Sequence, residues 1–164
     1  MEKPLYIFCC YARSDQWYLL ELKNRLIPLQ RAGLIIVHAD VDISPGEVWE
    51  PKIDHYLDTA HLILLLVSPD FIASEYCYSK EMVRALERHN EGNARLIPII
   101  VRPVDLRRVP FYKIQSLPTD AKPVAKWESK DDAFLDVVNG IEEVVETLLS
   151  PSQAPTQLVP GGFW

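Results

Sequence analysis

The sequence contains few glycines, and their spacing rules out the common nucleotide-binding loops. Only six glycines occur among the 164 residues, and they form neither G-x-G-x-x-G nor a P-loop. The sequence therefore excludes a Rossmann-type site for a bound dinucleotide cofactor, and it excludes an NTPase. The serines also lack a G-x-S-x-G elbow, which argues against hydrolase chemistry of the triad type.

Cysteine is also scarce. The three cysteines, Cys9, Cys10 and Cys77, are odd in number and have no C-x-x-C spacing, so neither a disulfide framework nor a zinc site is indicated. The four histidines show no H-E-x-x-H pattern. We therefore expect no metal and reduced thiols, as is usual in the cytoplasm.

Positive charge and long apolar runs are lacking as well. Seventeen basic against 23 acidic residues give a net charge of −6, which does not favour a nucleic-acid partner. No run reaches the roughly 18 apolar residues that a membrane span needs, and the N-terminus lacks the cationic start of a signal peptide. The sequence predicts a cytoplasmic domain that binds neither membrane nor nucleic acid.

What the sequence does contain is a repeated strand and helix pattern. Strand-like segments recur at intervals of roughly 30 residues, the length of a βαβ unit. The five expected strands are Leu5 to Tyr11, Leu34 to Asp40, Leu62 to Val67, Leu96 to Val101 and Pro123 to Trp127. Helices are expected over Asp15 to Gln30, Glu47 to Ala60, Ser68-Pro69 to His89, and Asp131 to Leu149. The pattern predicts a flavodoxin-like α/β fold, an open doubly wound sheet of five parallel strands in the order 2-1-3-4-5.

The C-terminal end differs in composition from the rest of the chain. Residues 1–149 have the content of one folded domain, whereas residues 150–164 are rich in proline, glycine and small polar residues. We interpret the second segment as a linker or truncated tail and expect further domains in a longer chain.

Four sequence blocks, in order and at consistent spacing, carry a family resemblance. They are Ile7 to Asp15, Asp40 to Trp49 with its Pro-Gly-Glu step, Ser68 to Glu81, and Arg95 to Pro103. On these blocks the chain resembles a bacterial TIR (Toll/interleukin-1 receptor) domain over Lys3 to Leu149. The resemblance implies signalling functions of the kind found in innate immunity and bacterial defence.

Many TIR domains cleave NAD+ at the bond between nicotinamide and ribose, using a glutamate of the third helix. By resemblance this catalytic residue is Glu81. Such cleavage passes through an oxocarbenium-like transition state, whose positive charge a carboxylate stabilises. NAD+ would then be a substrate and not a cofactor, giving nicotinamide and ADP-ribose or a cyclic variant.

The role of Glu81 has a simpler alternative, an ion pair with Lys80 or Arg84 on a solvated helix face. Cys77 and Glu81 are four residues apart in the expected third helix, so we expect them on the same helix face one turn apart. Cys77 could equally be an ordinary core residue.

Other candidates surround the expected carboxyl edge of the sheet. Tyr11 could stack on a base or cap the core, and Arg13 could meet a pyrophosphate or remain a solvated charge. Asp40 could instead cap a turn, and Trp49 could belong to the core. The predicted substrate-binding residues are Tyr11, Arg13, Asp40, Trp49, Ser68 and Cys77.

The sequence also departs from the family pattern. Cys10 stands where serine is common, and Ala12 replaces a small polar residue, so hydrogen bonding in the pocket could be weaker. The resemblance further implies activation by self-association, with the BB loop, residues 41–48, contacting a neighbouring domain. Two alternatives remain: a non-catalytic TIR–TIR scaffold, and, more weakly, a phosphorylatable receiver domain.

Overall fold

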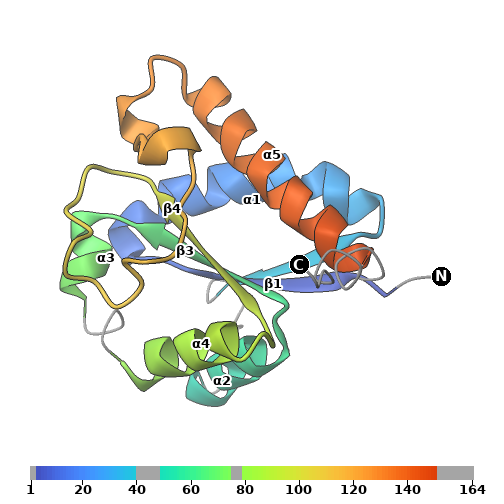
Figure 1. Ribbon diagram of the computed structural model, residues 1–164. Coiled ribbons are helices and arrows are strands. Elements are labelled where there is room, and N and C mark those ends of the chain that lie inside the picture. The colour runs from blue at the N-terminus through green and yellow to red at the C-terminus, as the bar shows by residue number, and fades with distance from the viewer. Residues whose placement is uncertain (1–2, 40–48, 75–78, 151–164) are drawn as a thin grey trace, which may run out of the picture.

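A parallel sheet forms the centre of the protein (Figure 1). The computed structural model describes residues 3–39, 49–74 and 79–150. All neighbouring strands are parallel, in the order β2-β1-β3-β4. The strands are β1 (Leu5–Cys10), β2 (Ile35–Ala39), β3 (Leu62–Val67) and β4 (Arg95–Ile100).

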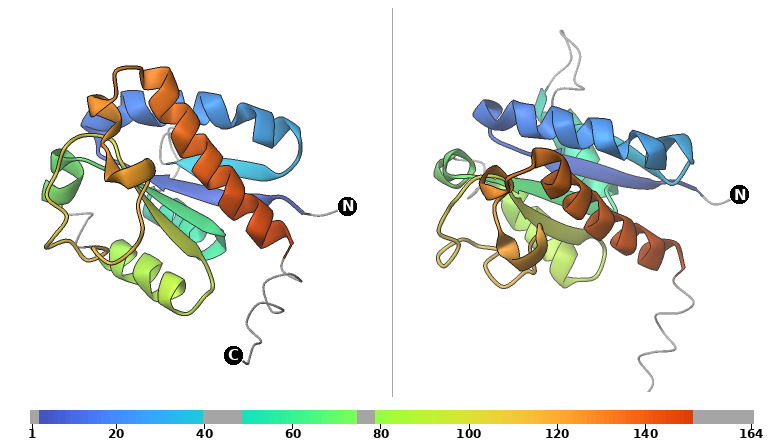
Figure 2. Two further views of the ribbon diagram at one scale, coloured as in Figure 1. Left: turned by 45° about the horizontal axis from the view of Figure 1, so that its top comes forward. Right: turned by 90° about the horizontal axis from the view of Figure 1, so that it is seen from above.

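Helices cover both faces of the sheet. Helices α1 and α5 lie together on one face, and α2 and α4 lie together on the other (Figures 1 and 2). The helices are α1 (Gln16–Arg31), α2 (Trp49–Thr59), α3 (Pro69–Ala73), α4 (Lys80–Asn90) and α5 (Lys130–Leu149). No helix in the described ranges is both long and apolar enough to cross a bilayer.

Strand β1 shows why both faces are apolar. Successive side chains of a strand point to opposite faces. Ile7 and Cys9 accordingly pack with α1 and α5, whereas Phe8 and Cys10 pack with α2 and α4. All six residues of β3 are buried, as its continuous apolar run predicts.

The predicted α/β architecture, a parallel sheet between helices, is confirmed, but the sheet in the described residues has four of the five predicted strands, in the order β2-β1-β3-β4. The predicted fifth strand, Pro123 to Trp127, is wrong, because Val124–Lys126 form a 3-10 helix. The position beside β4 is filled by a single bridge, in which Leu117 N–H donates to the Pro98 carbonyl at 2.9 Å and Ile100 N–H donates to the Leu117 carbonyl at 2.8 Å. This pairing cannot extend toward the start of β4. The next hydrogen bond would need a backbone N–H from Pro98, and proline has none.

The predicted third helix is also wrong in one respect, since two helices replace it. α3 ends at Ala73, and Ser74 has extended backbone with ψ 154° while its hydroxyl donates to the Phe71 carbonyl. α4 begins at Lys80, where Ser79 is the N-cap. Serine favours such ends because its hydroxyl competes for backbone hydrogen bonds. The helix that carries Glu81 therefore begins at Lys80, and Cys77, the predicted partner of Glu81 on one helix face, lies outside the described residues.

Candidate functional site

The carboxyl ends of three strands are joined by a buried carboxylate. Asp15, which follows β1, is 1% exposed. Arg102, which follows β4, donates from Nε to Asp15 Oδ1 at 2.8 Å, and the Ser68 hydroxyl after β3 donates to Asp15 Oδ2. Ser68 Oγ also accepts the Phe71 N–H at 3.1 Å, which caps α3. The Ser68 hydroxyl, predicted to bind substrate, is thus buried and engaged in internal hydrogen bonds.

A second carboxylate extends this network to the surface. Arg102 donates from Nη2 to Asp70 Oδ2 at 2.7 Å, and the Ser14 hydroxyl donates to the same oxygen at 2.7 Å. These two hydrogen bonds, the Ser14 bond foremost, lower the pKa of the Asp70 carboxyl. The guanidinium of Arg102 therefore bridges the segments that follow β1 and β3. We call Ser14, Asp15, Ser68, Asp70 and Arg102 the carboxyl-edge network.

Two further predicted residues lie beside this network. Tyr11 is half-buried directly after β1 and packs against the core on the α1 and α5 side. Arg13 is exposed in the 3-10 helix Arg13–Asp15. Both lie at the carboxyl edge, as their position in the sequence predicts.

Glu81 lies in the first turn of α4, which Ser79 starts by accepting the Met82 N–H at 3.3 Å. Its side chain is half-buried and lines a hollow of about 310 Å³ between α2 and α4. We call this the acidic hollow; its lining residues are Asp54, Asp58, Glu81, Val83, Arg84 and Glu87. Four of these six side chains are carboxylic acids.

The nearby arginine is paired elsewhere. Arg84 forms an ion pair with Asp58, which joins α4 to α2 and raises the pKa of the Arg84 guanidinium. No ion pair connects Glu81 to Arg84 within the described part of the chain, and the side chain of Lys80 is outside it. The alternative in which Arg84 neutralises Glu81 is therefore not what the structure contains.

The predicted residues are only partly brought together. Neither Tyr11, Arg13 nor Ser68 belongs to the described lining of the acidic hollow. Asp40 and Cys77 lie outside the described residues, as does the side chain of Trp49, whose backbone begins α2.

Sequence reasoning missed most residues of this region, and two pairs of them illustrate why. Asp15 and Arg102 fall inside the blocks that carry the family resemblance, but their pairing spans 87 positions and no local pattern reveals it. Asp54 and Asp58 are four residues apart on α2, so their shared helix face was visible in the sequence.

Comparison with known proteins gives a consistent family. A family model for the TIR domain matches residues 7–134. The uncharacterized protein y4lF of Sinorhizobium fredii is 41% identical over 149 residues, which cover 91% of this chain and 46% of that protein. Human Toll-like receptor 1 is 26% identical over 113 residues, which cover 67% of this chain and 14% of the receptor. The chain thus spans less than half the length of either relative.

A solved structure supports the fold alone. The TIR domain of the Toll-related receptor TRR-2 from Hydra magnipapillata superimposes with a TM-score of 0.57 at 20% identity. The match covers 83% of this chain and 97% of that domain.

Proposed function

This chain belongs to the TIR domain family, and from that premise we propose that it is an NAD+-consuming effector domain. It cleaves the bond between nicotinamide and ribose and releases nicotinamide with ADP-ribose or a cyclic variant. NAD+ is consumed as substrate, and no cofactor takes part.

The observation that carries the proposal is the environment of Glu81. Its half-buried carboxylate faces a hollow and has no cationic partner among the described side chains, so its negative charge is available. A carboxylate held near the ribose stabilises the positive charge that develops as the glycosidic bond breaks.

The acidic hollow as a whole supports the same chemistry. In the described lining, Asp54, Asp58 and Glu87 add negative charge around Glu81, against the positive charge of Arg84. Such a field favours the cationic nicotinamide ring of NAD+ and the oxocarbenium-like transition state. The same field repels the diphosphate, which must therefore lie outside the hollow, for example toward Arg13.

Self-association completes the proposal. The predicted substrate residues do not form one lined pocket within the described residues, so we assign the completed site to an assembled state. The BB loop, residues 41–48, is the proposed contact, and it lies outside the described residues. Closure of a loop by a neighbour would complete the site as substrate-induced closure does in other enzymes.

The second candidate is a non-catalytic TIR–TIR scaffold. This scaffold is favoured because the predicted substrate-binding residues do not form one pocket within the described residues. The Ser68 hydroxyl is engaged in the carboxyl-edge network, and Tyr11 and Arg13 are not in the described lining of the hollow. Under this alternative Glu81 is a surface residue.

The two candidates are separated by measuring nicotinamide release from NAD+ with the chain tethered at high density on vesicles. Glu81→Gln removes the charge at nearly constant volume and should lower kcat by about 10²-fold or more, as loss of a transition-state stabiliser does. Glu87→Gln is the matched comparison, because Glu87 lines the same hollow on the same helix. This variant weakens the field of the hollow but keeps the Glu81 carboxylate, so it should lower kcat far less than Glu81→Gln.

Activity lost in Glu81→Gln and retained in Glu87→Gln would establish the enzyme. If tethered wild type self-associates yet leaves NAD+ intact, the scaffold is the correct function. Equal losses in both variants would mean that only the overall charge of the hollow matters and would contradict the role of Glu81.

A further inference from the structure

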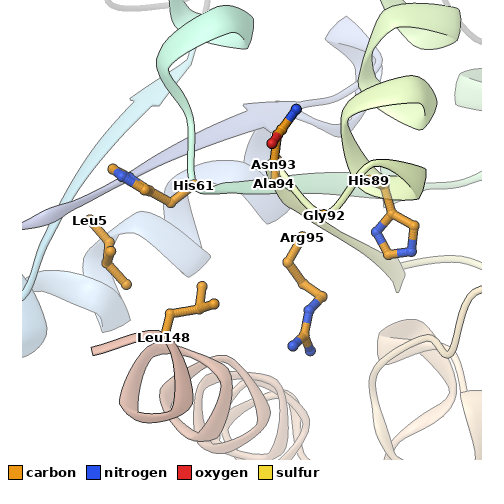
Figure 3. A pocket seen from close by; sticks show the side chains of 8 residues that line it. All are labelled: Leu5, His61, His89, Gly92, Asn93, Ala94, Arg95 and Leu148. Carbon is orange, nitrogen blue, oxygen red and sulfur yellow. The ribbon is translucent and has the colours of Figure 1, made fainter. Parts of the chain in front are cut away.

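Two hollows adjoin at the opposite edge of the sheet, where the strands begin. The first, of about 340 Å³, lies among the start of β4, the end of α4 and the end of α5 (Figure 3). The second, of about 630 Å³, follows the outer side of β4 toward residues 113–117 and α5. His89 and Arg95 line both hollows, so the two hollows meet at these side chains.

His89 presents a fixed hydrogen-bond donor here. Its Nδ1 accepts the Leu96 N–H at 3.0 Å, so the neutral ring carries its proton on Nε2. Burial, and secondarily the charge of Arg95, lower the pKa of His89 and favour this neutral form. The Nε2–H is then available to an acceptor in the hollow.

Arg95 supplies the positive charge. Its side chain extends between Leu148 and His89 (Figure 3) and is exposed. Arg25 and Arg102 each pair with carboxylates, whereas no ion pair of Arg95 occurs in the described part of the chain. Lys113 and Glu143 line the second hollow, and the described lining of the first hollow contains no carboxylate.

The second hollow has an apolar floor. Leu96, Ile97, Ile114, Leu117 and Val144 line it, and its volume falls in the range of small-molecule sites. The hollow exists because Pro98 stops the Leu117 bridge from extending into a fifth strand. An apolar floor beneath a cationic rim suits a ligand with an anionic group and an apolar body.

We propose that His89 and Arg95 form a binding site for an organic phosphate, with the phosphate on these two side chains and the apolar body in the second hollow beside Lys113. A phosphate accepts hydrogen bonds from a guanidinium in a bidentate manner, which fits Arg95. The site does not depend on the proposed function. Glu81 and His89 lie at opposite ends of α4, roughly 12 Å apart along a helix that rises about 1.5 Å per residue.

The test follows the His89 ring signals by NMR during titration with inorganic phosphate and with phenyl phosphate at constant ionic strength. We expect saturable shifts of His89, with phenyl phosphate half-saturating at a concentration about tenfold lower because its ring is buried. Arg95→Gln should abolish the shifts. Arg108→Gln, which removes an exposed arginine of the loop after β4, should leave them unchanged.

Three results would overturn the site. They are the absence of saturation with either compound, identical titrations of wild type and Arg95→Gln, and equal loss in Arg108→Gln. If inorganic phosphate and phenyl phosphate bind equally well, the assignment of the apolar hollow is wrong.

Discussion

At the scale of single residues, Asp15 has the most demanding environment. A buried carboxylate without partners is costly, and here the Arg102 guanidinium and the Ser68 hydroxyl satisfy it. The sequence shows Asp15 only as a polar residue at the start of a predicted helix. Its burial depends on Arg102, which no local pattern connects with it.

Removing the Arg102 guanidinium should therefore destabilise the folded protein. We expect Arg102→Met to lower the free energy of unfolding by about 3 kcal/mol, because it leaves Asp15 charged, buried and without its cation. Urea unfolding measures the loss. The matched control is Arg107→Met, whose exposed pair with Asp105 is screened by solvent and should contribute far less. Equal losses in the two variants would contradict the importance of the buried pair.

Two histidines should make stability depend on pH. His61 Nδ1 accepts the Tyr6 N–H at 2.8 Å, as His89 Nδ1 accepts that of Leu96. Desolvation lowers the pKa of both imidazoles, so protonation costs more in the folded state than in the unfolded state. Their contribution is full above the ordinary pKa of about 6.5 and is lost as the pH falls below it.

Unfolding midpoints measured between pH 5 and 7.5 check this expectation. Wild type should lose stability on acidification through this range. In the double variant His61→Gln, His89→Gln, each glutamine keeps an acceptor oxygen but does not titrate in this range. Its unfolding midpoint should therefore change less with pH than that of wild type. An unchanged slope in the double variant would assign the pH dependence to other groups.

At the scale of elements, the sheet edges are the informative feature. On the outer side of β2, Gln30 Oε1 accepts the Val37 N–H at 3.0 Å. On the outer side of β4, the Leu96 N–H donates to His89 Nδ1, and Pro98 has no N–H to donate. Side chains thus hinder pairing with strands of other molecules at these positions of both edges.

Unblocking an edge should cause aggregation. Gln30→Leu leaves the Val37 amide without its acceptor, so we expect faster exchange of that amide and light scattering that increases with protein concentration. Gln30→Glu retains an acceptor oxygen and should behave like wild type. Scattering from both variants alike would indicate a general loss of stability.

The elements also show what sequence patterns can predict. β3 was predictable because six consecutive apolar residues are typical of a strand buried on both faces. α5 was predictable from its apolar periodicity and acidic first turn. The break after Ala73 was not, since serine occurs both inside helices and at their ends. For the candidate site, the family blocks singled out Glu81, and its catalytic role stays a prediction.

At the scale of the whole molecule, charge is distributed unevenly over a chain of net charge −6. Carboxylates gather in the acidic hollow at the start of α4, whereas His89, Arg95 and Lys113 gather near its end. In the two proposals made above, the cationic ring of NAD+ binds near the start of α4 and the phosphate binds near its end. The two proposed ligands would therefore not compete for one site.

The proline ring of Pro98 also makes two outcomes of the same backbone mutually exclusive. Pro98→Val would restore a backbone N–H at this position. That N–H could donate to the carbonyl of Gln115, two residues before Leu117, and the pairing could then extend into a fifth strand. That strand would fill the space beside Leu96 and Ile97. A fifth strand and an open hollow beside β4 are thus alternatives, and Pro98 favours the open hollow.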